Sequence, residues 1–349
     1  MMSCVYNERH DFVGIVVKPN GALLKVLVTG GAGFIGSNFV RRVFDGNLSG
    51  ITEVTVLDKL TYAGVRDNLE SVWQNKTFKF VKGDICDLAL VTPLLDSVDA
   101  VINFAAESHV DRSIVSAADF VETNVKGVQV LLDAIKASGR RIRYVQVSTD
   151  EVYGSITTGS WDEGFPLLPN SPYSASKAAG ELMARSYQRT HGLDVVITRC
   201  SNNYGPYHFP EKLIPLFITN LLEGKKIPVY GSGENVRDWL HVDDHCRAIH
   251  LALMKGKSGE VYNIGGGQEL TNLEITSRII RLMGADKSSI RYVEDRKGHD
   301  LRYSVNWKKI NKELGYKPQM KFEDGLGKTI EWYRANRAWW EPLKNRAGL

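Results

Sequence analysis

The chain has 349 residues, of which 43% are hydrophobic and 24% are charged, a balance typical of a globular protein with one large or two cooperating domains. Its formal net charge of +4 is not gathered into basic runs, so neither nucleic acid nor a membrane surface is expected as a partner. No stretch has the length of a transmembrane helix, and the first 24 residues lack the apolar core of a secretory signal.

The cysteines and histidines are not spaced as metal ligands. Cys4, Cys86, Cys200 and Cys246 are far apart in the sequence, and free thiols of this kind are typical of a reducing cytoplasm, where we expect the protein. The segment Asp243-Asp244-His245 has the composition of a metal cluster, but acids in the first turn of a helix explain it better. No metal is therefore expected.

The first predicted element is a strand at residues 25–29, which enters a glycine-rich turn and then a helix. Glycines at positions 30, 33 and 36 would let the backbone turn tightly and approach a pyrophosphate, which the helix N-terminus would then face. A second strand ends in Asp58, which follows Gly36 by 22 positions, close to the spacing of an acidic residue that accepts ribose hydroxyls. Because a carboxylate repels a 2′-phosphate, the predicted cofactor is NAD rather than NADP.

Two more strands are predicted before the middle of the chain. The strand at 78–81 leads to Asp84 and Ile85, which could reach an adenine, and the strand at 100–104 leads to small alanines that would allow close approach of a cofactor. His109 follows the alanines, where a structural role is more common than a catalytic one. Helical stretches between the strands predict a parallel sheet of the Rossmann, doubly wound type.

A cluster of reactive side chains follows the next predicted strand, at residues 144–147. Asp150 and Glu151 should lie at the carboxyl edge of the sheet, where open α/β folds bind ligands. Tyr173 and Lys177 lie four apart in a helix-forming segment, so they share a face. A nearby ammonium favours phenolate, which would make Tyr173 a base near neutral pH. Either motif alone is common on solvated surfaces, but both follow a dinucleotide loop.

The second half of the chain has more glycine, proline and aromatic residues, especially around 202–239. The predicted organisation is an N-terminal extension at 1–24, an NAD-binding domain at 25–200 and a substrate domain at 201–349. The last is expected to be a smaller mixed α/β unit, interleaved with returning Rossmann elements such as 260–264.

These motifs resemble those of the extended short-chain dehydrogenase/reductase superfamily, and within it the nucleoside-diphosphate-sugar 4,6-dehydratases. The resemblance covers nearly everything from residue 25 to residue 340 and is carried by the segments 58–64, 105–113, 148–154, 171–177, 200–206, 210–215, 237–240 and 298–303. The triplet Thr149-Asp150-Glu151 is the discriminating feature, because epimerases and decarboxylases of the superfamily generally lack the acidic pair.

The resemblance implies NAD-dependent dehydration of dTDP-glucose to a 4-keto-6-deoxy sugar. Tyr173 would take the proton of the 4-hydroxyl as hydride leaves C4, while Lys177 lowers the pKa of Tyr173 and holds the nicotinamide ribose. Thr149 would hydrogen-bond the 4-oxygen. Glu151 would then remove the C5 proton, which the ketone acidifies, and protonated Asp150 would protonate the departing 6-hydroxyl before hydride returns to C6.

The resemblance also assigns the ligand contacts. Those expected with NAD are Gly30, Gly33, Phe34, Ile35, Gly36, Asp58, Lys59, Leu60, Thr61, Asp84, Ile85, Phe104, Ala105, Ala106, Ser108, Thr123, Ser148, Tyr173, Lys177 and Asn203. Those expected with the nucleotide sugar are Ser108, Thr149, Asn202, Lys212, Leu213, Pro228, Tyr230, Arg237, Asn272, Arg296, His299 and Tyr303. The two arginines suit a diphosphate, which accepts bidentate hydrogen bonds. A homodimer through helices within 120–137 and 174–191 is implied as well.

Two alternatives stay open at this point. One is a dehydratase or 4-epimerase that acts on another nucleotide sugar, and the other is a non-catalytic NAD-binding protein, since fold does not imply function. The nucleotide base is not decided by any single residue, because thymine differs from uracil by one methyl group, worth about 1–3 kcal/mol in an apolar pocket. The short segment at 155–171 resembles enzymes of deoxysugar pathways.

Overall fold

The computed structural model describes residues 23–295 and 298–349 of the chain. The predicted substrate contact Arg296 and nearly all of the predicted N-terminal extension lie outside these ranges, as does Cys4. Within them, Cys86, Cys200 and Cys246 are free thiols, as predicted. None of the helices in the described part of the chain is both long and apolar enough to cross a bilayer.

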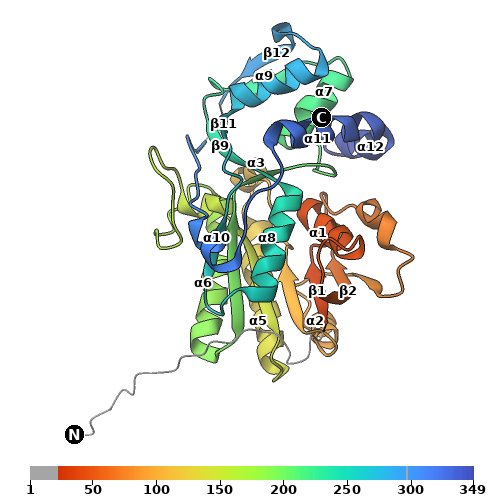
Figure 1. The fold of residues 1–349 in the computed structure, drawn as a ribbon, viewed down its shortest axis with the longest axis vertical. Helices are drawn as coiled ribbons and strands as arrows, with labels where there is room; N and C mark the ends of the chain where they lie inside the picture. The colour runs from red at the N-terminus through yellow and green to blue at the C-terminus, as the bar shows by residue number, and fades with distance from the viewer. Residues whose placement is uncertain (1–22, 296–297) are drawn as a thin grey trace, which may run out of the picture.

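A seven-stranded parallel sheet forms the centre of the molecule (Figure 1). In spatial order its strands are β10 (Val261–Ile264), β6 (Asp194–Cys200), β5 (Arg143–Thr149), β4 (Ala100–Asn103), β1 (Leu24–Thr29), β2 (Ile51–Asp58) and β3 (Phe78–Lys82). The predicted doubly wound sheet is thereby confirmed. The strand order reverses between β1 and β4, and Thr29 at the end of β1 pairs with both Leu57 and Asn103. This reversal opens the crevice in which such sheets bind ligands.

Helices cover both faces of the sheet, which is why β4, β5, β6 and β10 are buried along their whole length. One face packs against α1 (Phe34–Phe44), α8 (Val242–Lys255) and α10 (Lys308–Leu314). The other packs against α2 (Leu88–Leu95), α5 (Gly127–Ala137) and α6 (Pro172–His191). Shorter helical segments are η1 (Arg66–Val72), α3 (Val110–Val115), α4 (Ala118–Val121), η2 (Glu122–Lys126), η3 (Asp150–Tyr153) and η4 (Lys287–Ser289).

A second, smaller group of elements lies beyond the carboxyl ends of the large sheet, at the top of Figure 1. Its strands are β7 (Asn202–Tyr204), β9 (Val236–His241) and β11 (Glu269–Thr271) in one sheet, and β8 (Ile227–Tyr230) and β12 (Ile290–Val293) in another. Its helices are α7 (Leu213–Leu222), α9 (Asn272–Met283), α11 (Phe322–Ala335) and α12 (Arg337–Arg346). They share a separate apolar core, so the ligand crevice lies between two packed bodies.

Candidate active site

A cavity of about 680 Å³ opens where the two bodies meet, at the carboxyl ends of the central strands. Every described residue that was predicted to contact cofactor or substrate lines this cavity, with one exception. The exception is Leu60, whose side chain packs against the apolar core and whose N–H donates to Asp58 Oδ1 at 2.8 Å. Residues far apart in the sequence are therefore brought into one space, while their contacts with ligands remain predictions.

The glycine-rich turn between β1 and α1 is pressed against the segment that follows β4. Gly30 has φ +68°, and a Cβ at this position would lie 2.5 Å from the main-chain nitrogen of Ala105. A Cβ on Gly36 would lie 2.4 Å from the carbonyl oxygen of Gly30. The turn therefore tolerates no side chain at either position. The first turn of α1 has no side-chain cap, and its residues Phe34, Ile35 and Gly36 line the cavity, an arrangement that fits the pyrophosphate of a dinucleotide.

Asp58 joins the end of β2 to this turn. Its buried carboxylate accepts hydrogen bonds from the N–H groups of Ala32 and Leu60, each at 2.8 Å, and burial raises the pKa of the carboxyl. A carboxylate has about four acceptor positions, so two hydrogen bonds to the main chain leave capacity for ribose hydroxyls. Next to it, Lys59 Nζ lies 2.7 Å from Asp84 Oδ2, linking two of the predicted cofactor contacts.

The acidic pair occupies the first turn after β5, as predicted. Thr149 caps that turn, because its Oγ1 accepts the N–H of Glu151 and donates to Asp150 Oδ1, both at 3.3 Å. Asp150 is 1% exposed, and within the described part of the chain its Oδ2 has no hydrogen-bond partner. Burial, followed by the nearby charge of Glu151, raises the pKa of Asp150 well above its usual value. This shift favours the protonated form of Asp150, while Glu151 is only partly buried and accepts from Ser174 Oγ at 3.3 Å.

Tyr173 and Lys177 lie on one face at the start of α6, which Ser171 caps. Burial raises the pKa of Tyr173 well above its usual value, and the nearby charge of Glu151 raises it further. Burial also lowers the pKa of Lys177 to about 8, and its ammonium donates to the carbonyl oxygen of Val147 at 2.7 Å. Burial is the main cause of the raised pKa of Tyr173, so the lowering of the Tyr173 pKa by Lys177 stays a prediction for the protein with its cofactor bound.

Arg237 on β9 brings a buried cation to the opposite wall of the cavity. Its guanidinium donates to the carbonyl oxygens of Val236 and Asp300 at 2.8 and 2.9 Å and lies 4.2 Å from the centre of the Tyr303 ring. The Tyr303 hydroxyl in turn donates to Asp300 Oδ2 at 2.6 Å. Rigid support of this kind suits recognition of an anionic ligand such as a diphosphate.

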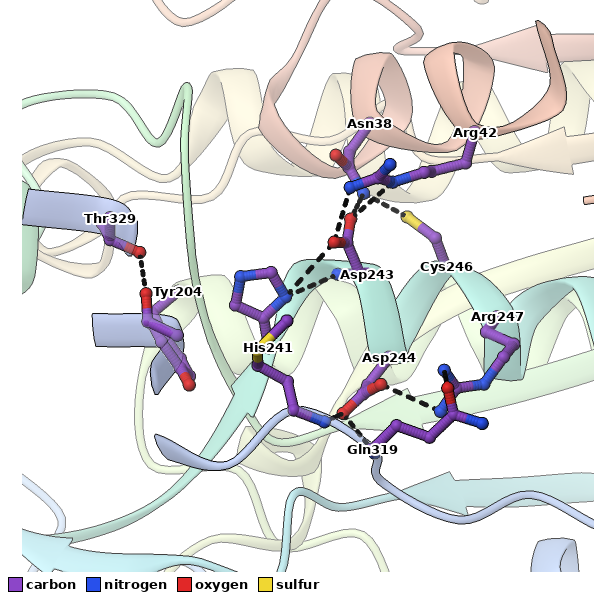
Figure 2. A network of polar contacts seen from close by, with 12 residues as sticks. Asn38, Arg42, Tyr204, His241, Asp243, Asp244, Cys246, Arg247, Gln319 and Thr329 are labelled. Atoms are coloured by element: carbon purple, nitrogen blue, oxygen red, sulfur yellow. Dashed lines mark hydrogen bonds and ion pairs between the residues drawn. The ribbon is translucent and has the colours of Figure 1, made fainter. Parts of the chain in front are cut away.

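The acidic segment at the start of α8 is occupied by structural contacts (Figure 2). Asp243 receives hydrogen bonds from Arg42 and Asn38, and Asp244 receives them from the main chain at Gln319 and Met320. His245 Nδ1 instead lies 2.9 Å from Asn203 Oδ1. The three consecutive side chains thus diverge, and the described residues include no group of three potential metal ligands.

Comparisons with known proteins agree with this geometry. The family model described as GDP-mannose 4,6-dehydratase matches residues 27–329. The chain belongs to this family. It is 59% identical over 325 residues to a dTDP-glucose 4,6-dehydratase of Streptomyces niveus, covering 92% of this chain and 96% of the relative. The resemblance to the 4,6-dehydratases that the sequence motifs indicated is confirmed.

Solved structures extend the likeness to three dimensions. A dTDP-glucose 4,6-dehydratase of Streptomyces venezuelae, crystallised with NAD, has 60% identity and a TM-score of 0.91, with 92% of this chain and all of that chain covered. A UDP-glucuronic acid 4-epimerase of Bacillus cereus, also with NAD, has 28% identity and a TM-score of 0.83, with 89% and 99% covered. The dehydratase family thus shares its fold with epimerases, and the site must distinguish them.

Several residues of the dehydratase cavity were not among the predicted contacts. They include Tyr62, Cys200, His208 and Glu211, and also His109, for which a structural role was favoured. All of them fall inside or directly beside the segments that carried the family resemblance, which is the signal that could have found them. Their chemistry depends on neighbours in space. The Glu211 carboxylate, for example, lies 3.2 Å from Arg112 and 3.7 Å from His109.

Proposed function

We propose that this protein catalyses the NAD-dependent dehydration of dTDP-glucose to dTDP-4-keto-6-deoxyglucose, in the cytoplasm and as a step of a deoxysugar pathway. The observation that carries the proposal is the acidic turn Asp150-Glu151, placed in one cavity with Tyr173 and Lys177 and facing a dinucleotide-type glycine turn. The high identity to dTDP-glucose 4,6-dehydratases, compared with 28% to an epimerase, supports dehydration over epimerisation.

The residues around β1, β2 and β4 would hold the cofactor. Gly30 and the first turn of α1 would receive the pyrophosphate, and Asp58 would accept the ribose hydroxyls. When bound, NAD⁺ would accept the hydride from C4 and return it to C6, and the positive charge of its oxidised nicotinamide ring favours the phenolate form of Tyr173.

The chain's own groups would move the protons. Tyr173 takes the proton of the C4 hydroxyl, so that the carbon becomes a ketone and the C5 proton becomes acidic. Glu151 takes the C5 proton, and Asp150 gives its proton to the C6 oxygen, which leaves as water. This elimination needs opposite protonation states in the pair, and the raised pKa of Asp150, which favours its acid form, supports that assignment. Glu151 returns its proton to C5 when C6 is reduced.

The nucleotide part of the substrate would occupy the smaller body. Arg237 would bind the diphosphate, and Asn202, Lys212, Leu213, Pro228, Tyr230, Asn272, His299 and Tyr303 would surround the remainder of the nucleotide sugar. Arg296 is proposed as a further substrate contact on the family resemblance alone.

We also propose a homodimer formed through the helices within 120–137 and 174–191, the second of which lies in α6. These helices expose the apolar side chains of Val121 and Leu182, and the end of α3 exposes that of Val115; a second copy of the chain would cover them. Light scattering of the purified protein at micromolar concentration should then give twice the mass of one chain.

The test of the catalytic proposal is incubation of the purified protein with dTDP-glucose in D₂O without added cofactor. The expected product is a 4-keto-6-deoxy sugar with deuterium at C5, and no net NADH should form. Reaction of UDP- or CDP-sugars instead of dTDP-glucose would overturn the substrate assignment alone. Inversion at C4 without loss of water would show an epimerase, and binding of NAD without turnover of any nucleotide sugar would show a non-catalytic protein.

A further inference from the structure

A buried polar network lies next to the cavity, among residues that do not themselves line it. Arg199 on β6 is 1% exposed, and its Nε donates to both carboxylate oxygens of Glu181 on α6, at 2.9 and 3.1 Å. Its Nη1 donates to the Tyr153 hydroxyl at 2.6 Å, and that hydroxyl donates to Asn263 Oδ1 on β10 at 2.8 Å. Both hydrogen-bonding directions at the phenol oxygen are therefore fixed.

This network ends on the catalytic turn. Tyr153 is the last residue of η3, the helical turn that carries Asp150 and Glu151 on its first two positions. The ring of Tyr153 stacks on Trp161, with 5.1 Å between the ring centres and 18° between the ring planes. Trp161 is hydrogen-bonded to the segment at 304–306, just after Tyr303. The turn is thus fixed at its start by the Thr149 cap and at its end by a buried phenol.

The other end of the network lies on the helix that carries the oxidising pair. Tyr173, Lys177 and Glu181 follow one another at intervals of four on α6, so they lie along one face. The first two line the cavity, whereas Glu181 is completely buried and pairs with Arg199. A continuous chain of directed hydrogen bonds therefore joins the helix of Tyr173 to the turn of Glu151.

We propose that the Glu181–Arg199–Tyr153 chain holds the acid–base pair of the elimination in register with the pair that oxidises C4, and that Tyr153 is a positioning residue for the elimination. This inference rests on the proposed function. Tyr153 itself has no place among the cavity-lining residues, so it acts through the turn. The oxidising pair is held independently, by the α6 cap at Ser171 and by the hydrogen bond from Lys177 to Val147.

The test is the variant Tyr153→Phe, which keeps the stacked ring and removes only the hydroxyl. Elimination should slow by about 10- to 100-fold, because moving a catalytic group by up to about 1 Å reduces the rate by that order of magnitude. The rate of C4 oxidation should change by less than about twofold. In a single turnover with dTDP-glucose, the near-ultraviolet absorbance of reduced nicotinamide should therefore accumulate on the variant and not on the wild type. Deuterium incorporation at C5 should be delayed to the same extent.

The matched control is Tyr262→Phe. Tyr262 is buried on β10 next to Asn263, but its hydroxyl contacts Glu313 and the N–H of Lys257, away from the catalytic turn. Removing that hydroxyl should lower stability without any accumulation of reduced nicotinamide. If Tyr153→Phe does not fold, Trp161→Phe replaces it, with a smaller accumulation expected.

Three outcomes separate the possibilities. The positioning role is overturned if folded Tyr153→Phe slows oxidation and elimination equally or accumulates no reduced nicotinamide. The same holds for folded Trp161→Phe where it replaces Tyr153→Phe. Accumulation of reduced nicotinamide in Tyr262→Phe as well would show a general loss of stability rather than a role of the network. Absence of dTDP-glucose turnover by the wild type would instead overturn the proposed function, so the two failures are distinguishable.

Discussion

At the scale of single residues, the protonation of Asp150 is the feature on which the proposed elimination depends. Its carboxyl is buried beside Glu151 and Asp238, and Arg237 compensates only in part, so its pKa lies well above that of the unfolded chain. Because the folded state keeps a proton that the unfolded state releases, this carboxyl contributes stability below the unfolded pKa, about 4. That contribution is lost as pH rises toward the folded pKa.

The variant Asp150→Asn should therefore behave in two measurable ways. Without the acid, elimination should fall by about 10²- to 10⁴-fold, and reduced nicotinamide should accumulate because C4 oxidation continues. In urea unfolding, the stability of the wild type relative to the variant should decrease as the pH rises from the unfolded pKa, about 4, toward the folded pKa. A constant difference across this range would show that Asp150 is ionised in the folded protein.

Asp243→Asn is a control in which the stability difference should change with pH in the opposite direction. Although burial alone would raise the pKa of Asp243, the hydrogen bonds and charge of Arg42 lower it overall. Its contribution to stability is present above the unfolded pKa and is lost as pH falls through the folded value, so the advantage of the wild type over this variant should shrink in acid. Activity per folded molecule should stay unchanged, because Asp243 lies outside the cavity wall.

At the scale of elements, the turn between β1 and α1 shows how a local motif becomes a binding site. Gly30→Ala should remove bound NAD, because the added methyl group would collide with the main chain at Ala105. We expect at least about tenfold less NAD released per denatured chain, together with a loss of stability of about 1–3 kcal/mol for the strained backbone. The measurement is the nucleotide content of the purified variant.

Gly46→Ala separates strain from collision. Gly46 also has a positive φ, +82°, but a Cβ there would meet nothing within 4 Å. This variant should lose stability of about 1 kcal/mol and keep its NAD. If both variants keep NAD equally well, the close approach of the turn to Ala105 does not shape the cofactor site.

Prediction from sequence succeeded where local order along the chain determines geometry. The glycine turn, the spacing to Asp58 and the acidic turn after β5 each follow from a few consecutive residues at a strand end. The raised pKa of Tyr173 was not visible in the sequence, because it depends first on burial of the phenol and then on the charge of Glu151, which another element contributes. Leu60 stands outside the cavity lining because a positive φ of 57° turns the chain after Asp58, and its side chain packs against the core. The Tyr153 network was not visible at all, since its members lie on four elements distant in sequence.

At the scale of the whole molecule, two packed bodies share one cavity. NAD should therefore stabilise the protein through contacts with the large sheet, and the nucleotide of the substrate through contacts with the smaller body. A ligand at about 100 times its Kd adds about 2.7 kcal/mol to the free energy of unfolding. In Arg237→Ala, dTDP should no longer raise the melting temperature, because the diphosphate loses its buried cation, while NAD should still raise it. Thermal melts with each nucleotide provide the measurement.

Arg247→Ala is the control for that experiment. Arg247 pairs with Asp244 at 2.9 Å on α8 and does not line the cavity. Its removal should lower the melting temperature of the protein and leave both nucleotide-induced shifts intact. Loss of the NAD shift in Arg237→Ala would contradict the assignment of the two walls, since a general distortion would then explain both effects.

The position of β10 has a consequence for synthesis on the ribosome. This strand closes the edge of the large sheet beside β6, yet the whole of β7, α7, β8, β9 and α8 lies between the two in the chain. While those elements are being translated, β6 presents unpaired N–H and C=O groups, which are a template for pairing with other chains. The same late strand carries Asn263, the acceptor for Tyr153. A nascent chain that stalls before Val261 therefore has an aggregation-prone edge and an unsupported catalytic turn.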